Sequence, residues 1–194
     1  MSLSDKSLPA AEQDIAWMRR VAQGDTTAFE QLIEAHQTRV VGTVAKMLGD
    51  DRDAEDLAQQ VFVRIWNSAP RYRPTAKFTT WLFTIMRNLV FNELRRRKRH
   101  DAVRSTDEES AREIATDAPS PDGAFLTVEL ERAIQAALSA LPEAQRMAIV
   151  LRRYEECSYE EIAEILGLSL AAVKSLLFRA RADLREQLRK YLDE

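Results

Sequence analysis

The sequence predicts an all-α protein made of two small helical domains that are joined by a flexible acidic linker. The chain has 194 residues but only 5 Gly and 6 Pro, too few for the many turns of a β-sandwich or barrel. Ala, Leu, Glu and Arg, which favour helices, are prominent instead. Apolar residues recur at three- and four-residue spacing along most of the chain, which is typical of amphipathic helices.

The composition argues against several classes of protein. No apolar run approaches the roughly 18–20 residues that cross a bilayer, and the first residues lack the pattern of a secretory signal. The single cysteine, Cys157, cannot form an internal disulfide, and no Cys/His cluster has metal-ligand spacing. The sequence has no nucleophile elbow or phosphate loop, and its only histidines are His36 and His100. We therefore expect a cytoplasmic protein that is not an enzyme and holds no metal or cofactor.

The charge is unevenly distributed although the formal net charge is only -3. Residues 25–100 carry 13 basic and 9 acidic groups, whereas residues 101–130 carry 2 basic and 8 acidic groups. Such asymmetry hints at a nucleic-acid partner. Residues 100–123 are poor in large apolar side chains and end in a Pro- and Gly-containing cluster, so they predict a linker with at most a short helical turn at residues 108–114.

Two helices are predicted before the prolines of the first block. Residues 26–48 show helical spacing of their apolar side chains, and Gly49 is suited to end this helix. The next helix starts at Asp53 and runs through residue 69; its first carboxylates suit the positive end of a helix dipole. Its expected buried residues are Leu57, Val61 and Ile65, with Phe62 and Trp66 beside them.

A long third helix follows Pro70 and Pro74, from Thr79 or Thr80 to His100. Residues 95–99 are five consecutive cations. One or two cations would complement the helix dipole, but five repel one another, so a phosphate-binding surface is the stronger interpretation. Aromatic and amide side chains interleave with or precede this basic tract, a combination by which proteins hold unstacked single-stranded bases.

The second block predicts a helix-turn-helix. Helices are expected at residues 129–141 and 143–154, before a capping box in which Ser158 is followed three residues later by Glu161. Gly167 marks a turn, and Ser169 is expected to cap the next helix. An ordinary helical hairpin is the competing interpretation. The polar and basic groups of the last helix instead suit a DNA major groove; they are Lys174, Ser175, Arg179, Arg181 and Arg185.

In this order, the two blocks resemble a bacterial RNA polymerase sigma factor of the extracytoplasmic-function (ECF) class, over about residues 20–190. DAEDLAQQVF resembles the helix that binds the polymerase β′ clamp, and TTWLFTIMRN resembles the promoter-melting helix. The resemblance implies a region 2 helical bundle at residues 25–100 and a region 4 helix-turn-helix at 129–194, with an N-terminal segment at 1–24, which includes the start of the first helix, and the linker at 101–128. It implies a factor that binds core RNA polymerase, recognises the -10 and -35 promoter elements and assists strand opening.

The resemblance also assigns three sets of residues. Those implied to dock core polymerase are Asp53, Glu55, Asp56, Gln59, Gln60 and Phe62. Those implied to hold the -10 strand and its backbone are Trp81, Arg87, Asn88, Asn92, Arg95, Arg96, Arg97 and Lys98. Those implied to contact the -35 duplex are Ser169, Lys174, Ser175, Arg179 and Arg181. Leu176 departs from the pattern, because family members often carry Arg there.

The resemblance implies three partners and no insertion into a membrane. They are core RNA polymerase (through its β′ clamp and β subunit), promoter DNA and an anti-sigma factor.

The length of the linker is compatible with this function. A linker of about 25 residues reaches at most roughly 80–90 Å, and the two promoter elements lie roughly 50–60 Å apart along the duplex, so the linker can join them. The rival hypotheses are an autonomous helix-turn-helix regulator and an adaptor without DNA affinity.

Overall fold

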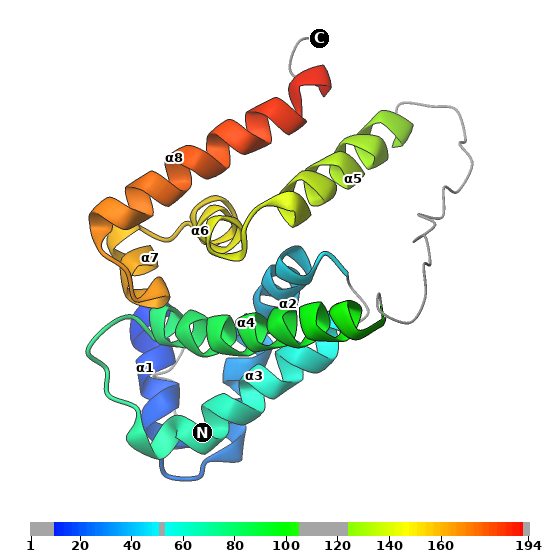
Figure 1. The fold of residues 1–194 in the computed structure, drawn as a ribbon. Helices are drawn as coiled ribbons and strands as arrows, with labels where there is room; N and C mark the ends of the chain where they lie inside the picture. Colours follow the sequence, from blue (N-terminus) through cyan, green and yellow to red (C-terminus); the bar gives the residue numbers. More distant parts are fainter. Residues whose placement is uncertain (1–9, 51–52, 105–123, 192–194) are drawn as a thin grey trace.

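The computed structural model describes residues 10–50, 53–104 and 124–191. These residues form helices and connecting turns without any strand, as the all-α prediction requires (Figure 1). The first block comprises α1 (Ala10–Val21), α2 (Thr26–Leu48), α3 (Ala54–Ser68), the 3-10 turn η1 (Ala69–Arg71) and α4 (Phe78–Arg104). The second comprises α5 (Ala124–Ala140), α6 (Glu143–Arg153), α7 (Tyr159–Leu166), α8 (Leu170–Gln187) and η2 (Arg189–Tyr191).

Three predicted boundaries need correction. The N-terminal segment holds a complete helix, α1, which ends before a turn at Gly24 with φ 88°, rather than the start of the following helix. Helix α4 begins at Phe78 and continues to Arg104, and α5 begins at Ala124 rather than at residue 129. Helical structure therefore takes up both ends of the predicted linker. Residues 105–123, including the helical turn expected at 108–114, lie outside the described part of the chain.

The first block packs α1, α3 and α4 around the buried face of α2. Asp25 caps α2 by accepting a hydrogen bond from the Ala28 amide at 3.0 Å. Gly49 ends the helix with φ 72°, and a Cβ there would lie 2.6 Å from the Ser139 hydroxyl of α5. The left-handed backbone angle therefore favours glycine at this position, and a larger residue would also displace the Ser139 hydroxyl.

The helix-turn-helix prediction is confirmed in detail. The Ser158 hydroxyl accepts from the Glu161 amide at 3.1 Å, and the Glu161 carboxylate accepts from the Ser158 amide at 2.7 Å, which completes the capping box. Gly167 ends α7 with φ 67°, and Ser169 caps α8. Ile162 and Val173 are fully buried between the two helices. Local sequence signals are sufficient to fix this motif.

Removing the Ser158 hydroxyl is expected to lower the free energy of unfolding by about 1 kcal/mol, because the Glu161 amide then loses its acceptor. Urea unfolding of Ser158→Ala against the parent chain measures this loss. Ser68→Ala is the matched control, because Ser68 precedes η1 but makes no side-chain cap. Equal losses for both variants would contradict the assignment.

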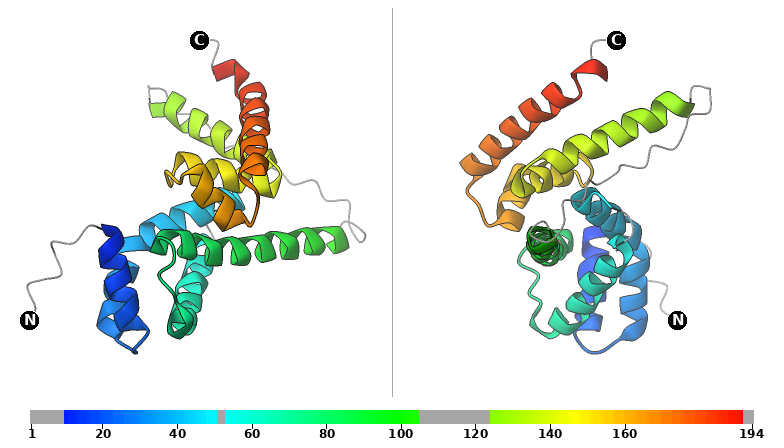
Figure 2. Two further views of the ribbon diagram at one scale, coloured as in Figure 1. Left: turned by 90° about the vertical axis from the view of Figure 1, so that its left-hand side faces the viewer. Right: turned by 45° about the vertical axis from the view of Figure 1, so that its right-hand side comes forward.

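The two blocks lie directly against each other, with α7 packed on α4 (Figures 1 and 2). The Glu155 carboxylate, between α6 and α7, accepts from Arg39 Nε and from the Thr43 hydroxyl, both on α2. Lys77 and Glu161 form an ion pair at 2.8 Å. None of the described helices has the length and apolar character needed to cross a membrane.

Candidate nucleic-acid and polymerase interfaces

The C-terminal half of α4 presents a cationic surface. Arg95, Lys98 and Arg99 are exposed and line a shallow depression of about 420 Å³ together with Asn92. Lys98 also forms a 2.7 Å ion pair with Glu143 of α6. Arg95 donates hydrogen bonds to the Phe91 carbonyl and to Asn92 Oδ1, both at 3.2 Å, which orients its guanidinium beside the amide. The structure thus places these cations beside the Asn92 amide.

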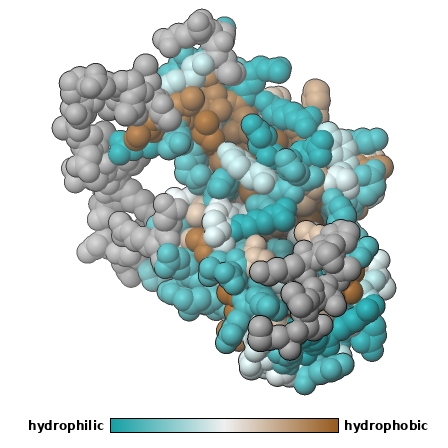
Figure 3. All heavy atoms as spheres, turned by 180° about the vertical axis from the view of Figure 1, so that it is seen from behind, coloured by the Kyte–Doolittle hydropathy of each residue, from teal (hydrophilic) through white to brown (hydrophobic). Residues whose placement is uncertain are grey.

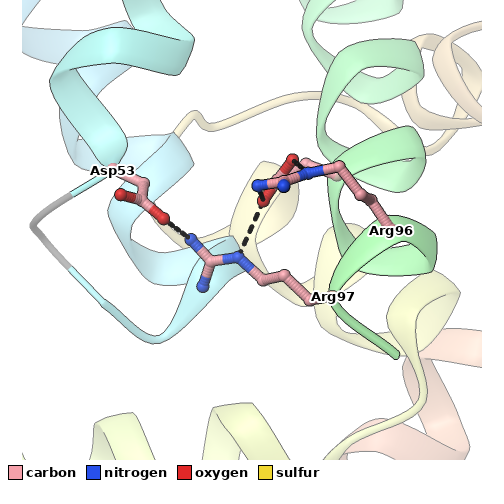
Figure 4. A network of polar contacts seen from close by, with 4 residues as sticks. Asp53, Arg96 and Arg97 are labelled. Carbon is pink, nitrogen blue, oxygen red and sulfur yellow. Dashed lines mark hydrogen bonds and ion pairs between the residues drawn. The ribbon is translucent and has the colours of Figure 1, made fainter. Parts of the chain in front are cut away.

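Arg96 and Arg97 are tied to carboxylates of the chain (Figure 4). Arg96 forms a two-bond pair with Glu93, with Nε to Oε2 at 2.7 Å and an Nη to Oε1 at 2.8 Å. Arg97 donates to Glu93 Oε1 at 3.0 Å and to Asp53 Oδ2 at 2.5 Å. Asp53 stands at the start of α3, the helix that is expected to dock polymerase. The ion pair therefore joins a predicted polymerase-binding residue to a predicted -10-binding residue.

The N-terminal half of α4 is largely packed against protein. Trp81 is half-buried, with its ring centroid 5.0 Å from that of Tyr72 and 6.0 Å from that of Phe78. Arg87 donates to the Ile165 carbonyl at the end of α7 at 2.6 Å and to Asn88 Oδ1 at 2.6 Å. In this arrangement Arg87 therefore belongs to the contact between the blocks rather than to a free cationic surface.

Helix α8 exposes Lys174, Ser175 and Arg179 along one stretch. The Ser169 hydroxyl serves as the helix cap, accepting from Ala172 at 3.2 Å. Arg181 donates to the Tyr159 hydroxyl at 3.4 Å, and this cation lowers the pKa of Tyr159 from its ordinary value.

Phe178 is a surface residue that the sequence argument missed. Its side chain is 75% exposed, between the cationic turns of α8. The helical spacing of the apolar residues could have revealed it. Phe178 falls outside the stripe of buried residues formed by Val173, Leu177 and Ala180. Leu176, in contrast, packs against the core. The residue that departs from the family pattern is therefore partly buried in this protein.

A groove of about 870 Å³ runs between α2 and α3. Glu55 and Gln59 line it, whereas Asp56 and Gln60 are exposed outside it. Phe62 also lines the groove but is only 6% exposed, because most of its ring belongs to the core. Its neighbour Val63 is 59% exposed and lines the same groove. Val63 is an exposed apolar residue that the sequence analysis did not single out.

The remaining candidates for chemistry have structural roles. His36 and Asp14 are buried and joined by a 2.8 Å hydrogen bond between Nε2 and Oδ1, which links α2 to α1. Cys157 is buried, and burial raises the pKa of its thiol to about 11. Among the described residues, no group of three or more His, Cys, Asp or Glu side chains is placed to hold a metal ion.

Comparison with known proteins identifies the family of the chain. Residues 32–100 match the family model Sigma-70 region 2, and residues 131–184 match Sigma-70, region 4. The chain is 32% identical over 188 residues to the RNA polymerase sigma-H factor of Pseudomonas aeruginosa, which covers 94% of this chain and 97% of that protein. It is 33% identical to the ECF RNA polymerase sigma factor SigW of Bacillus subtilis, over 89% of this chain and 95% of the relative.

Solved structures give the same result. CnrH in complex with the cytosolic domain of CnrY matches with a TM-score of 0.66 and 26% identity, over 91% of this chain and 97% of that chain. RpoE in complex with the anti-sigma factor NepR from Bartonella quintana matches with a TM-score of 0.66 and 25% identity, over 86% and 98%. The chain therefore belongs to the ECF class of the sigma-70 family, whose members direct core RNA polymerase to promoters and start transcription there.

Proposed function

We propose that this sigma factor, acting in the cytoplasm and not as an enzyme, recognises the -35 element with α8 and opens the -10 element with α4. The observation that carries this proposal is the capped helix-turn-helix whose second helix exposes Lys174, Ser175 and Arg179. A recognition helix of this kind enters the major groove, where such side chains reach base edges and phosphates. The region 4 unit then extends over residues 129–194, and region 2 over residues 25–100.

At the -10 element, the depression on α4 would hold the displaced strand. Asn92 offers both a donor and an acceptor to a base edge, and Arg95 and Lys98 flank it with positive charge. An unstacked base would pack on the exposed part of the half-buried Trp81 ring. Arg87 and Asn88 would join this surface only after α7 has moved away from α4.

Core polymerase would dock on the groove between α2 and α3. The groove combines exposed Val63 with Glu55 and Gln59, so it suits a partner segment with an apolar ridge and basic flanks. We assign this partner to the β′ clamp, which the resemblance implies for this helix. On the second block, Val128 and Leu130 of α5 are exposed, and apolar side chains gather on the upper part of the face in Figure 3. This surface would contact the β subunit.

We expect the blocks to move apart when both promoter elements are engaged, because the elements lie roughly 50–60 Å apart. Binding would therefore separate α7 from α4. An inhibitory partner would act in the opposite direction by covering these surfaces. The solved complex of RpoE with the anti-sigma factor NepR supports an anti-sigma factor as that partner.

Phe178 is expected to contribute to -35 binding by packing on a thymine methyl group in the major groove. Phe178→Ala should weaken binding of the holoenzyme to a -35 duplex by about fivefold, which corresponds to about 1 kcal/mol. The effect should disappear when the contacted thymine is replaced by uracil. An equal loss on both duplexes would contradict a methyl contact.

Run-off transcription tests the proposed function as a whole. Core RNA polymerase is incubated with a library of promoter fragments, with and without the protein. Protein-dependent transcripts that share two short upstream elements are expected, and the shared sequences identify both elements. If core polymerase gains no initiation while the protein alone binds duplex DNA specifically, the protein is an autonomous regulator and the proposal fails.

A further inference from the structure

Arg97 is held between two carboxylates that come from different helices. Glu93 lies one turn earlier on α4, and Asp53 lies at the start of α3, 44 residues away in sequence. Figure 4 shows the Arg97 guanidinium directed toward Asp53. The Arg97 side chain is 25% exposed, against 68% for Arg96. Of these two neighbouring cations, Arg97 is therefore the one that is held back from solvent.

Glu93 fixes the arginine pair. Its side chain is only 14% exposed and receives the two-bond pair from Arg96 in addition to the bond from Arg97. The hydrogen bonds from Arg96 lower the pKa of Glu93, and the one from Arg97 adds to this effect. Burial acts in the opposite direction, but the pKa stays below its usual range. Glu93 thus remains a carboxylate at neutral pH and orients both guanidinium groups.

Asp53, unlike Glu93, is exposed and is held by a single arginine. It stands at the N-cap position of α3, where an aspartate ordinarily accepts a hydrogen bond from the first turn, but it makes no side-chain cap bond. Its carboxylate instead meets Arg97, and its side chain is 55% exposed. The exposed Asp53 carboxylate accepts from one Nη of Arg97. It occupies a place that a DNA phosphate oxygen would take, since both are oxygen anions that accept hydrogen bonds from a guanidinium.

We propose that Asp53 is a positioning residue that occupies Arg97 in the free protein, and that docking of polymerase on α3 draws Asp53 away and releases Arg97 to the DNA backbone. This inference rests on the proposed function, because it needs polymerase on α3 and promoter DNA on α4. Glu93 stays in place and keeps the released guanidinium oriented. Polymerase binding and strand binding are then coupled, and each raises the affinity of the other by the same factor.

The first test uses the full-length free protein and a fluorescein-labelled twelve-residue oligothymidine, whose binding needs no promoter sequence. Removing the charge with Asp53→Asn is expected to tighten binding two- to fivefold, the range given by about 0.5–1 kcal/mol for an exposed ion pair. The slope of log affinity against log salt should become steeper by about 0.7, the value for one further phosphate contact on a single strand.

A double-mutant cycle distinguishes this release from a general gain of positive charge. In the Arg97→Gln background, Asp53→Asn should add no more affinity than Glu34→Gln, an equal charge change at an exposed position of α2. The proposal is overturned if Asp53→Asn tightens binding equally with and without Arg97. It is also overturned if Asp53→Asn in the parent chain gains no more than the Glu34→Gln control.

The second test adds saturating core polymerase. Since α3 is then docked, the parent and Asp53→Asn holoenzymes should bind the same oligonucleotide with affinities equal to within about 1.5-fold. A persistent two- to fivefold difference would show that docking does not release Arg97. Failure of run-off transcription would overturn the proposed function, but the cycle on free protein needs no initiation and would still report whether Asp53 occupies Arg97.

Discussion

Replacing Arg146 with methionine is expected to lower the free energy of unfolding by about 3 kcal/mol, because a buried arginine here satisfies carbonyls at the ends of two helices. Its guanidinium donates to the Met47 carbonyl in the last turn of α2 at 2.5 Å, and to the Ser139 and Leu141 carbonyls at the end of α5. Burial lowers the pKa of Arg146 from its ordinary value, yet the group remains charged at neutral pH. Its charge also complements both helix dipoles.

Urea unfolding followed by circular dichroism measures this loss. Methionine keeps most of the volume, so the loss reports the missing donors rather than a cavity. Arg153→Met is the matched control, because Arg153 is exposed on the same helix. A loss below about 1 kcal/mol for Arg146→Met, or one equal to the control, would contradict this role.

Local patterns in the sequence predicted α6, α7, α8 and the turn of the second block well, whereas α5 begins five residues before its predicted start. The capping box at Ser158 and the glycine at position 167 act within four residues, so their structural meaning can be inferred without knowing the fold. The same is true of the cationic surface around Arg95 and Lys98, since it lies on one stretch of one helix. The α4 boundary was wrong by four residues because nothing in residues 101–104 stops a helix.

The contacts between distant segments were not predictable in this way. Arg146 meets a carbonyl 99 residues away, and Glu155 meets Arg39 from 116 residues away. Nothing in the spacing of either residue distinguishes it from a solvated charge. Asp53 carried a local signal for a helix cap, but the fold brings Arg97 within reach, and the ion pair is formed in place of the cap bond. Partner choice of this kind depends on tertiary structure.

Glu155→Ala is expected to weaken the contact between the two blocks by a factor of about 5 to 150, which corresponds to about 1–3 kcal/mol. The parent carboxylate accepts from Arg39 and, at 2.5 Å, from the Thr43 hydroxyl, which is 1% exposed. Without the carboxylate the buried Thr43 hydroxyl loses this partner in the closed arrangement, whereas water satisfies it once the blocks separate. The variant should therefore open more often.

The reactivity of Cys157 measures this opening. Burial, and after it the Glu161 and Glu155 carboxylates, raise its pKa to about 11, against the cations Arg39 and Lys77. Cys157 lines a cavity together with Arg39 and Lys77 of the first block, so the thiol lies at the contact between the blocks. An exposed thiol has a pKa near 8.5 and reacts mainly as the thiolate. Glu155→Ala should thus accelerate labelling by a thiol reagent at pH 8, whereas Glu156→Ala, an exposed neighbour in the same loop, should not. Equal rates for the two variants would contradict the opening.

Glu155→Ala should also increase the affinity for core polymerase. If polymerase binds only the open form, a larger open population lowers the apparent dissociation constant. Cys157 labelling gives the factor by which Glu155→Ala raises the population of the open form. As long as most molecules remain closed, core polymerase should bind the variant more tightly by the same factor. A variant that opens more often but binds core polymerase more weakly would show that the contact through Glu155 is retained in the active complex. Separation of α7 from α4 would then not be part of promoter engagement.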